Sequence, residues 1–212
     1  MYELYYSPGN ASLAPHIILE EMGAEFELVL VDRKKNAQRS AEYLSLNPAG
    51  RIPTLVHGDL VVFESPAICI YLAEQCPALK LIPPEGSKSR PLFHQWLMYL
   101  TNTLQAELMI YFYPERHTTD PGGASNVRRA QELRIIDIFS LLDNQLGQND
   151  FLVGSEITVC DFFLFMLLHW ASGQQQPPLS FPNIGPYLKN IASRPSVIRA
   201  CTKEGIDISN YR

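Results

Sequence analysis

The chain has 212 residues, a net charge of −5 and 46% hydrophobic residues, which is typical of a globular protein and excludes an intrinsically disordered one. No stretch concentrates the cations that nucleic-acid binding requires, and no apolar run approaches the ~20 residues of a membrane span. We therefore expect no nucleic-acid partner and no membrane segment.

The first residues lack the basic and apolar regions of a signal peptide, so we expect a cytoplasmic protein. The four cysteines, Cys69, Cys76, Cys160 and Cys201, form no C-x-x-C pair and have no histidines at zinc-ligand spacing. The sequence predicts neither a metal site nor a redox dithiol. Cys69 and Cys160 lie within apolar helical patterns, where a buried and inert thiol is usual.

The first 31 residues predict a β-α-β unit. A short β-prone run at residues 3–6 ends in the turn sequence at residues 7–9. Apolar residues then recur at helical spacing from Leu13 to Met22, and Gly23 closes the helix. Residues 26–31 are rich in branched side chains and predict a second strand, parallel to the first because the connection is helical.

A hairpin and a further helix follow. Residues 40–46 are helix-prone, and the apolar runs at residues 51–56 and 60–63 flank a glycine-containing turn, which indicates an antiparallel hairpin. Ser65 and Pro66 then predict a helix start, with Ser65 as the N-cap and Pro66 at the first helical position.

The rest of the chain is predicted to be helical. Residues 77–87 contain three prolines and a glycine and read as a linker between a first domain at 1–76 and an all-helical domain at 88–212. One long helix is expected from about Leu92 to Phe112 and another around residues 133–146. Thr158 and Asp161 form a capping-box pattern before an apolar helix that we expect at the centre of this domain.

Three features of the first domain suggest a small peptide ligand. The turn at residues 6–12 directs backbone N–H groups and the positive end of a helix at an anion. Pro53 begins a strand; a trans proline there needs no ligand, whereas a cis one would turn the Ile52 backbone outward to pair with an extended peptide. Glu64 and Ser65 at a helix start suit the ammonium and carboxylate of an amino acid, although plain capping is the alternative.

The order and the sequences of these motifs resemble those of the glutathione S-transferase family, and most closely its bacterial beta class. The resemblance rests on the segments YYSPG and SLAPH, NPAGRIPTL and ESPAI, together with the Thr158 capping box, and extends over essentially the whole chain. It implies an α/β thioredoxin-like N-terminal domain and an all-α C-terminal helical bundle domain. It also implies a homodimer that uses glutathione as co-substrate and no metal.

The same resemblance assigns roles to individual residues. The Ile52 backbone would pair with the cysteinyl unit of glutathione beside a cis Pro53, Glu64 and Ser65 would hold the γ-glutamyl head, and Lys35 would reach the glycyl carboxylate. The residues expected to contact glutathione are Ala11, Lys35, Arg51, Ile52, Pro53, Glu64, Ser65, Asn102 and Gln105.

The chain departs from the family at the position that meets the sulfur. Beta-class enzymes have a cysteine where this chain has Ala11, and other classes have a serine where it has Asn10. On the long helix, Gln105 and Ala106 replace a histidine and a lysine. The sequence therefore lacks the usual thiol and the usual serine.

Activation of glutathione is still energetically feasible. A thiol of pKa ~8.5 is only about 3% ionised at pH 7, and a depression of two pKa units requires ~2.7 kcal/mol. A helix N-terminus supplies ~0.3–2 kcal/mol and one hydrogen bond to a charged group ~1.5–3 kcal/mol. We hypothesise that the donor is the Asn10 amide or the Ser12 hydroxyl, with Tyr6 as a third candidate.

The second substrate is expected to be a small hydrophobic electrophile in an apolar pocket lined by Leu108, Tyr111, Phe112 and Tyr113, although simple packing also explains these side chains. Conjugation of glutathione is the leading function. A non-catalytic glutathione-binding or regulatory protein remains open, as does a glutathione-dependent isomerase or peroxidase.

Overall fold

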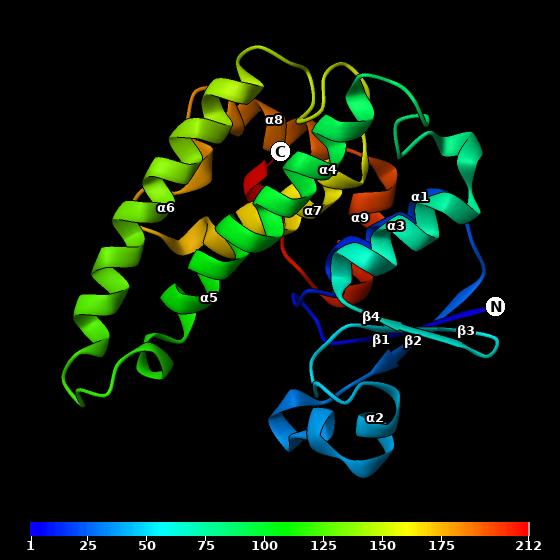
Figure 1. Cartoon of the computed structure of the whole chain (residues 1–212), viewed down its shortest axis with the longest axis horizontal. Coiled ribbons are helices and arrows are strands. Elements are labelled where there is room, and N and C mark those ends of the chain that lie inside the picture. The colour runs from blue at the N-terminus through cyan, green and yellow to red at the C-terminus, as the bar shows by residue number, and fades with distance from the viewer. Residues whose placement is uncertain (212) are drawn as a thin grey trace. The chain divides into compact units, whose positions relative to one another are not determined.

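The computed structural model describes residues 1–211 of the chain. Its contacts divide the chain into two compact units, one formed by residues 1–82 together with the C-terminal residues from Ile191 onward, the other by residues 83–190. We call them the first unit and the helical unit; Figure 1 traces them from the N-terminus to the C-terminus. The expected division had assigned every residue after 87 to the helical domain, so the structure differs at the C-terminal segment.

The first unit contains one four-stranded sheet of order β2-β1-β3-β4. The strands are β1 (Tyr2–Tyr6), β2 (Phe26–Leu30), β3 (Thr54–His57) and β4 (Leu60–Phe63). The β1 and β2 strands are parallel, and the other two pairings are antiparallel, as the sequence predicted. The third strand begins at Thr54, three residues later than expected, which leaves the residues before it outside the ladder.

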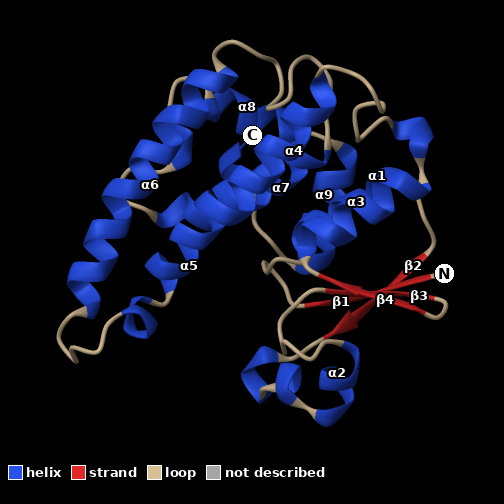
Figure 2. Ribbon diagram, viewed as in Figure 1, coloured by secondary structure: helices blue, strands red, loops and turns tan. Residues whose placement is uncertain are grey.

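Four helices pack in this unit: α1 (Leu13–Met22), α2 (Ala41–Leu46), α3 (Ser65–Gln75) and α9 (Pro195–Glu204). Figure 2 shows α1, α3 and α9 on one side of the sheet and α2 on the other. The core between the sheet and the larger helix layer is apolar and fully buried, and it includes Leu4, Ile17, Leu55 and Ile68.

The C-terminal helix α9 belongs to the first unit because one face of it packs against α1. Val197, Ala200 and Cys201 on that face are fully buried. Beside them Arg199 and Lys203 both contact the Glu20 carboxylate of α1, each at 2.6 Å. Apolar burial and this ion pairing together explain why the segment leaves the helical domain to which its sequence position had assigned it.

The helical unit comprises α4 (Ser89–Tyr99), α5 (Ala106–Phe112), α6 (Ala124–Leu146), α7 (Val159–Trp170) and most of α8 (Ile184–Ala192). Between α4 and α5 the helix continues through a π-helical segment, Leu100–Gln105, so the single long helix expected here contains a change of helical pitch. Such π segments occur frequently near functional sites.

The α7 helix forms the centre of this unit, as its sequence predicted. Every residue from Val159 to Leu168 is buried. The capping box at its start is present: Asp161 accepts the Thr158 N–H at 2.7 Å, and Thr158 accepts the Cys160 N–H. Asp161 also accepts the Tyr187 hydroxyl at 2.9 Å, which ties α8 to the start of α7.

Among residues 1–211, no helix combines the length and the apolar character that crossing a membrane would require. The four cysteines, all within the described residues, form no disulfide bond. Within the same residues, no three His, Cys, Asp or Glu side chains gather as a metal site would need.

Candidate active site at the turn between β1 and α1

The turn between β1 and α1 is closed by its own side chains. Gly9 has a φ of 66°, a left-handed conformation that glycine adopts without steric cost. The Ser12 hydroxyl donates to the Ser7 carbonyl at 3.2 Å and accepts the Ser7 N–H at 3.4 Å. Ser12 has no exposed surface and its only hydroxyl proton is used within the turn. Its expected role as a donor to a bound thiolate therefore does not fit this geometry.

Asn10 presents a different arrangement. Its side-chain oxygen accepts the Ala11 N–H at 2.9 Å, which satisfies one of the donors at the start of α1. The amide nitrogen of Asn10 donates to no described residue, so its two protons remain available above the turn. Tyr6, at the end of β1, is half-buried, and its hydroxyl likewise has no hydrogen bond to a described residue.

The backbone before β3 is held in place by α2. The Ile52–Pro53 peptide bond is cis, as the family resemblance implied. The Arg51 carbonyl accepts the Tyr43 hydroxyl at 2.6 Å and the Asn47 side-chain amide at 2.8 Å. Burial raises the pKa of Tyr43, which keeps the phenol protonated as a donor.

The Ile52 main chain has unused hydrogen-bonding capacity. Its side chain is buried with Val31 and Tyr43. Neither its N–H nor its C=O makes a hydrogen bond to a residue within 1–211. A free donor and acceptor on one residue just before β3, a strand that is itself paired with β1 and β4, can pair with an extended peptide as a strand partner would.

The start of α3 differs from its expected capping. Glu64, not Ser65, is the N-cap, with a φ of 72° that is uncommon for a residue with a side chain. Ser65 is the first helical residue and is buried, and its hydroxyl donates to the Ala11 carbonyl at 2.5 Å. The Ser65 proton is therefore used in a tertiary contact rather than in a cap. The exposed Glu64 carboxylate stays accessible to a ligand.

Lys35 lies at the end of a short 3-10 turn, Arg33–Lys35, that Asp32 caps. Its ammonium group is 3.5 Å from the Asp32 carboxylate, and its side chain is 84% exposed. Lys35 is thus loosely tethered and can reach an anion in the solvent.

The remaining predicted residues belong to the helical unit. Asn102 and Gln105 lie in the π-helical segment. Leu108 has no exposed surface, which assigns it to the core and removes it from any pocket lining. Tyr111 and Phe112 are half-buried and meet edge to face, with ring centroids 5.4 Å apart.

Cations accompany these aromatic rings. Arg116 lies over the Tyr113 ring at 4.2 Å, and Arg128 lies 5.4 Å from the centre of the Tyr111 ring. Burial raises the pKa of Tyr111, and nearby Glu132 adds to this effect, so this phenol is neutral at physiological pH.

One contact to the turn was not predicted from the sequence. The Gly9 N–H donates to the Glu204 carboxylate of α9 at 2.9 Å. A glutamate at the end of an amphipathic helix is ordinarily read as a solvated residue, so only its position after Cys201 on the buried face of α9 could have drawn attention to it.

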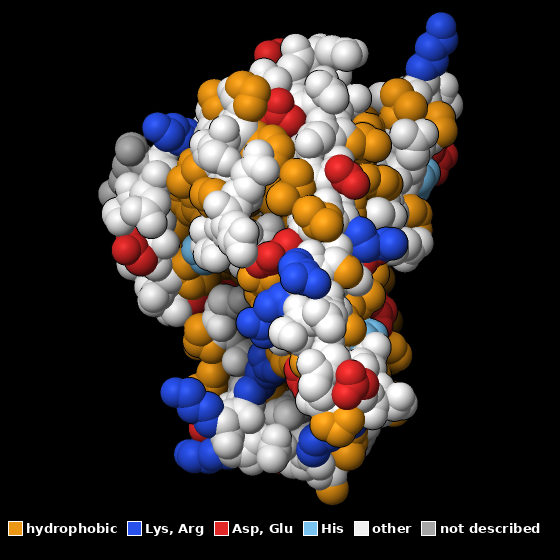
Figure 3. All heavy atoms as spheres, turned by 90° about the vertical axis from the view of Figure 1, so that its left-hand side faces the viewer, with side chains coloured by type: hydrophobic (Ala, Val, Ile, Leu, Met, Phe, Trp, Pro, Cys, Tyr) orange, Lys and Arg blue, Asp and Glu red, His pale blue; other side chains and the backbone are white. Residues whose placement is uncertain are grey.

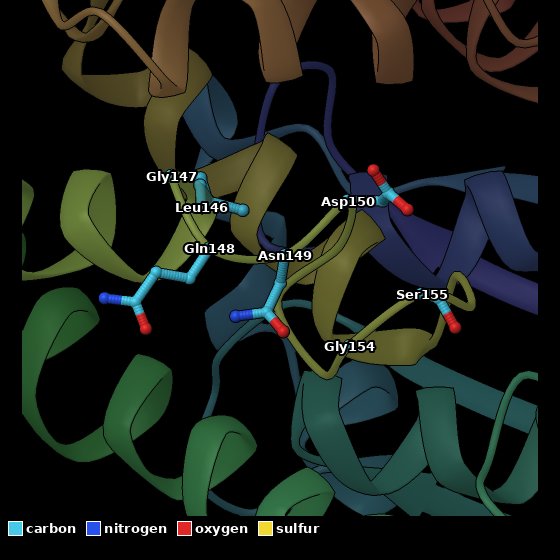
Figure 4. Close-up of a pocket in the computed structure, with 7 residues that line it drawn as sticks. All are labelled: Leu146, Gly147, Gln148, Asn149, Asp150, Gly154 and Ser155. Carbon is cyan, nitrogen blue, oxygen red and sulfur yellow. The ribbon is translucent and has the colours of Figure 1, made fainter.

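A separate pocket of about 360 Å³ lies in the helical unit at the loop that follows α6 (Figure 4). Its lining residues are Leu146, Gly147, Gln148, Asn149, Asp150, Gly154 and Ser155. It contains none of the predicted site residues, and Asp150 is its only titratable side chain, so it lacks the paired groups that acid–base chemistry uses.

Comparison with known proteins agrees with this geometry. Residues 2–74 match the family model of the glutathione S-transferase N-terminal domain, and residues 103–195 match that of the C-terminal domain. The glutathione S-transferase GstA of Escherichia coli O157:H7 is 32% identical over 96% of this chain and 99% of its own length.

Solved structures of glutathione S-transferases are also similar to this chain. A sphingomonad glutathione S-transferase complexed with glutathione has a TM-score of 0.83 at 32% identity and covers 97% of this chain and 100% of its own. A bacterial beta class enzyme from Sphingomonas chungbukensis has a TM-score of 0.81 at 34% identity, with coverage of 97% and 100%.

A mixed four-stranded sheet with a cis proline before its internal strand β3, combined with a helical unit, defines a two-domain glutathione-dependent enzyme fold. This chain belongs to the glutathione S-transferase family. The predicted fold, the transferase activity and glutathione as co-substrate are thereby confirmed.

Proposed function

We propose that glutathione binds with its sulfur over the turn before α1 and that the Asn10 side-chain amide stabilises the thiolate. The observation that supports this assignment is the contact between the Asn10 oxygen and the Ala11 N–H, which fixes the side chain and leaves its amide protons free. Ser12 cannot take this role while its proton is bonded to Ser7. Tyr6 remains the second candidate donor.

The energies are sufficient for this chemistry. One hydrogen bond from an amide to a thiolate contributes ~1.5–3 kcal/mol, and the N-terminus of α1 adds ~0.3–2 kcal/mol. Together they reach the ~2.7 kcal/mol that lowers a thiol pKa by two units. The thiolate then attacks the electrophile as a nucleophile held close to its target.

The peptide backbone of glutathione is proposed to pair with Ile52, whose N–H and C=O have no bond to a described residue. Arg51 and Pro53 flank that residue in the segment before β3 and are proposed to complete the contact with the peptide. The Tyr43 and Asn47 contacts to the Arg51 carbonyl support the required backbone orientation.

The two charged ends of glutathione find complementary groups in the same unit. We assign the γ-glutamyl ammonium to Glu64 and the γ-glutamyl carboxylate to the N–H groups at the start of α3, beginning with Ser65. The Ser65 hydroxyl proton is already used, so only its oxygen and its N–H are available. Lys35 would pair with the glycyl carboxylate. Ala11 packs at the start of α1, 8% exposed.

From the helical unit we propose that Asn102 and Gln105 add polar contacts to glutathione. The aromatic group at the end of α5, Tyr111, Phe112 and Tyr113, is assigned to a small hydrophobic electrophile. Aromatic rings supply large apolar contact area for such a ligand.

We further propose beta-class membership, a homodimer and a cytoplasmic location. The identity to the Sphingomonas chungbukensis enzyme supports the class. Large apolar side chains are exposed on both units, among them Phe63, Leu92 and Leu133, and apolar side chains reach the surface among charges of both signs on the face in Figure 3. Apolar exposure of this kind is consistent with a subunit interface.

The test is a titration of bound glutathione by the ultraviolet absorbance of its thiolate. Asn10→Asp keeps an oxygen for the Ala11 N–H and removes the donor protons, so the thiol pKa should rise by about one to two units. Asn10→Ser restores a donor and should recover much of the depression. A shift in Ser12→Ala with none in Asn10→Asp would assign the donor to Ser12 instead.

The same titration separates the alternatives. A wild-type protein that binds glutathione without a thiolate signal is a non-catalytic binding protein. Where the signal is present, a panel of aryl halides, maleyl-type isomerisation substrates and hydroperoxides distinguishes conjugation from isomerase or peroxidase activity.

A further inference from the structure

A buried carboxylate on α9, that of Glu204, holds the turn between β1 and α1 over which the glutathione sulfur is proposed to lie. Glu204, the last residue of α9, accepts the Gly9 N–H at 2.9 Å through one oxygen and contacts the His16 ring nitrogen Nδ1 at 2.7 Å through the other. The side chains of Glu204 and His16 have no exposed surface. One carboxylate thus joins the turn, α1 and α9.

The position of Glu204 is unfavourable for its own helix. The C-terminal end of a helix carries partial negative charge and stabilises cations, not carboxylates. A carboxylate without solvent exposure also requires compensation by hydrogen bonds. Because the helix dipole and burial both disfavour a carboxylate at this position, any stabilisation by Glu204 must come from its contacts with Gly9 and His16. A residue that is unfavourable for its own helix is expected at a functional site.

Simple docking of α9 on α1 does not require this residue. Arg199 and Lys203 already connect the two helices through Glu20 at the exposed edge of their contact. Glu204 differs from them in reaching past α1 to the Gly9 peptide. Gly9 directly precedes Asn10 in a turn that the Asn10 N–H closes on the Ser7 carbonyl at 3.1 Å, so a contact that holds the Pro8–Gly9 peptide group also restricts the backbone from which the Asn10 side chain extends.

We propose that Glu204 is a positioning residue for the thiolate site: it holds the Gly9 peptide, and through it the Asn10 amide, in the orientation that meets the sulfur. This inference rests on the proposed thiolate mechanism. Glu204 does not touch the substrate, so its effect should appear in the ionisation of the thiol and in kcat rather than in the affinity for the electrophile.

The experiment compares Glu204→Ala with Arg199→Ala in the full-length protein. Both variants remove a contact between α9 and α1, and both should lower the thermal midpoint. Only Glu204→Ala should raise the pKa of bound glutathione and lower kcat about tenfold, because small misplacements of catalytic groups have effects of that order or larger. Arg199→Ala should keep both values within about twofold of the wild type.

Glu204→Gln tests geometry against charge. Its amide oxygen can accept the Gly9 N–H and its nitrogen can donate to His16, so we expect kcat within about threefold of the wild type. If Glu204→Ala does not fold, Glu204→Asp replaces it, since a side chain shorter by one methylene cannot maintain both contacts and should reproduce the loss.

Three results would overturn the inference. The first is an unchanged thiolate titration in Glu204→Ala, or in Glu204→Asp if that variant is the one that folds. The second is an equal loss in Arg199→Ala, and the third is a Gln variant as impaired as the Ala variant. A wild type without a thiolate signal would refute the proposed mechanism, and this inference with it, whereas a normal wild-type signal that the variants do not move refutes only the positioning role.

Discussion

The Ser65 hydroxyl is the hydrogen-bond donor to the carbonyl of Ala11, the residue just before the N-cap of α1. The residue four positions after Ala11 is Pro15, which has no N–H and cannot donate to the Ala11 carbonyl. Ser65 donates to that carbonyl at 2.5 Å. The starts of α1 and α3, which hold the proposed sulfur and γ-glutamyl sites, are therefore linked by one side chain.

Replacing Ser65 by alanine should destabilise the protein by about 1–3 kcal/mol, because the Ala11 carbonyl loses its donor in a buried setting. The KM for glutathione should rise as well. Urea unfolding and steady-state kinetics measure the two effects. Ser45→Ala is the matched control, since the Ser45 hydroxyl also donates to a carbonyl, that of Glu42, but at an exposed position. Equal stability losses in the two variants would contradict the role given to burial.

Tyr43→Phe should weaken glutathione binding without touching the ligand. The Tyr43 phenol donates to the Arg51 carbonyl and, its proton being used there, accepts from Thr54 at 2.9 Å. Its removal should lower stability by about 1–3 kcal/mol and raise the dissociation constant of glutathione, because the Ile52 backbone loses its support. Calorimetric titration measures the affinity. Tyr99→Phe removes a hydroxyl with no hydrogen bond to a described residue and should leave the affinity unchanged.

The contact between α1 and α9 should weaken in acid. Burial acts to raise the pKa of Glu20, but hydrogen bonds and charges from Lys203 and Arg199 outweigh it and lower the pKa below its ordinary value of 4.5. A carboxyl group with a lowered folded-state pKa stabilises the protein above its unfolded-state pKa, and this stabilisation is lost as the pH falls through the folded value.

Glu20→Gln should remove this dependence. The stability difference between the wild type and Glu20→Gln should be constant from neutral pH to about pH 5 and should shrink below about pH 4. Thermal unfolding across that range measures it. A difference that grows in acid would show that the Glu20 pKa is raised.

Thiol reagents should distinguish Cys76 from the other cysteines. Cys69, Cys160 and Cys201 are fully buried, and burial raises the pKa of Cys160 strongly and that of Cys201 to about 12. Cys76 is only half-buried. A chromogenic disulfide reagent should modify one thiol quickly in the native protein, and Cys76→Ser should abolish that phase. Fast modification of a second thiol would show that one of the buried positions opens.

Local signals predicted the elements well where the chain has clear start and stop residues. Gly23 ends α1 in a left-handed conformation, and Thr158 and Asp161 begin α7, both as their sequence indicates. These cases succeed because the contacts that decide them lie within four residues of each other.

Predictions failed where a side chain makes a contact that its local sequence pattern does not show, or where the pattern gives no direction. Ser65 reads as an N-cap, but its hydroxyl bonds to Ala11, 54 residues earlier. Ser12 reads as a free hydroxyl, but it closes its own turn. Leu133 begins the apolar spacing that predicts the helix around residues 133–146, and it is 65% exposed, because spacing gives the period of a face and not its direction.

The packing of α9 against α1 could not be predicted from the sequence. Its apolar periodicity indicates an amphipathic helix but does not identify the partner that covers it. The ion pairs with Glu20 and the Glu204 contact to Gly9 join residues more than 170 positions apart. The cis isomer of the Ile52–Pro53 bond was predicted from the family resemblance alone, since composition and residue spacing do not distinguish cis from trans.

The dependence of the first unit on α9 sets an order for biosynthesis. Residues 1–82 leave the ribosome early, yet the helix that covers α1 and anchors the Gly9 peptide emerges only after the whole helical unit has been synthesised. Domains generally fold as units, with the N-terminal domain first during synthesis. In the first unit, however, the face of α1 that α9 covers stays exposed until α9 has been synthesised. The proposed glutathione site can therefore take its final form only once α9 has been synthesised.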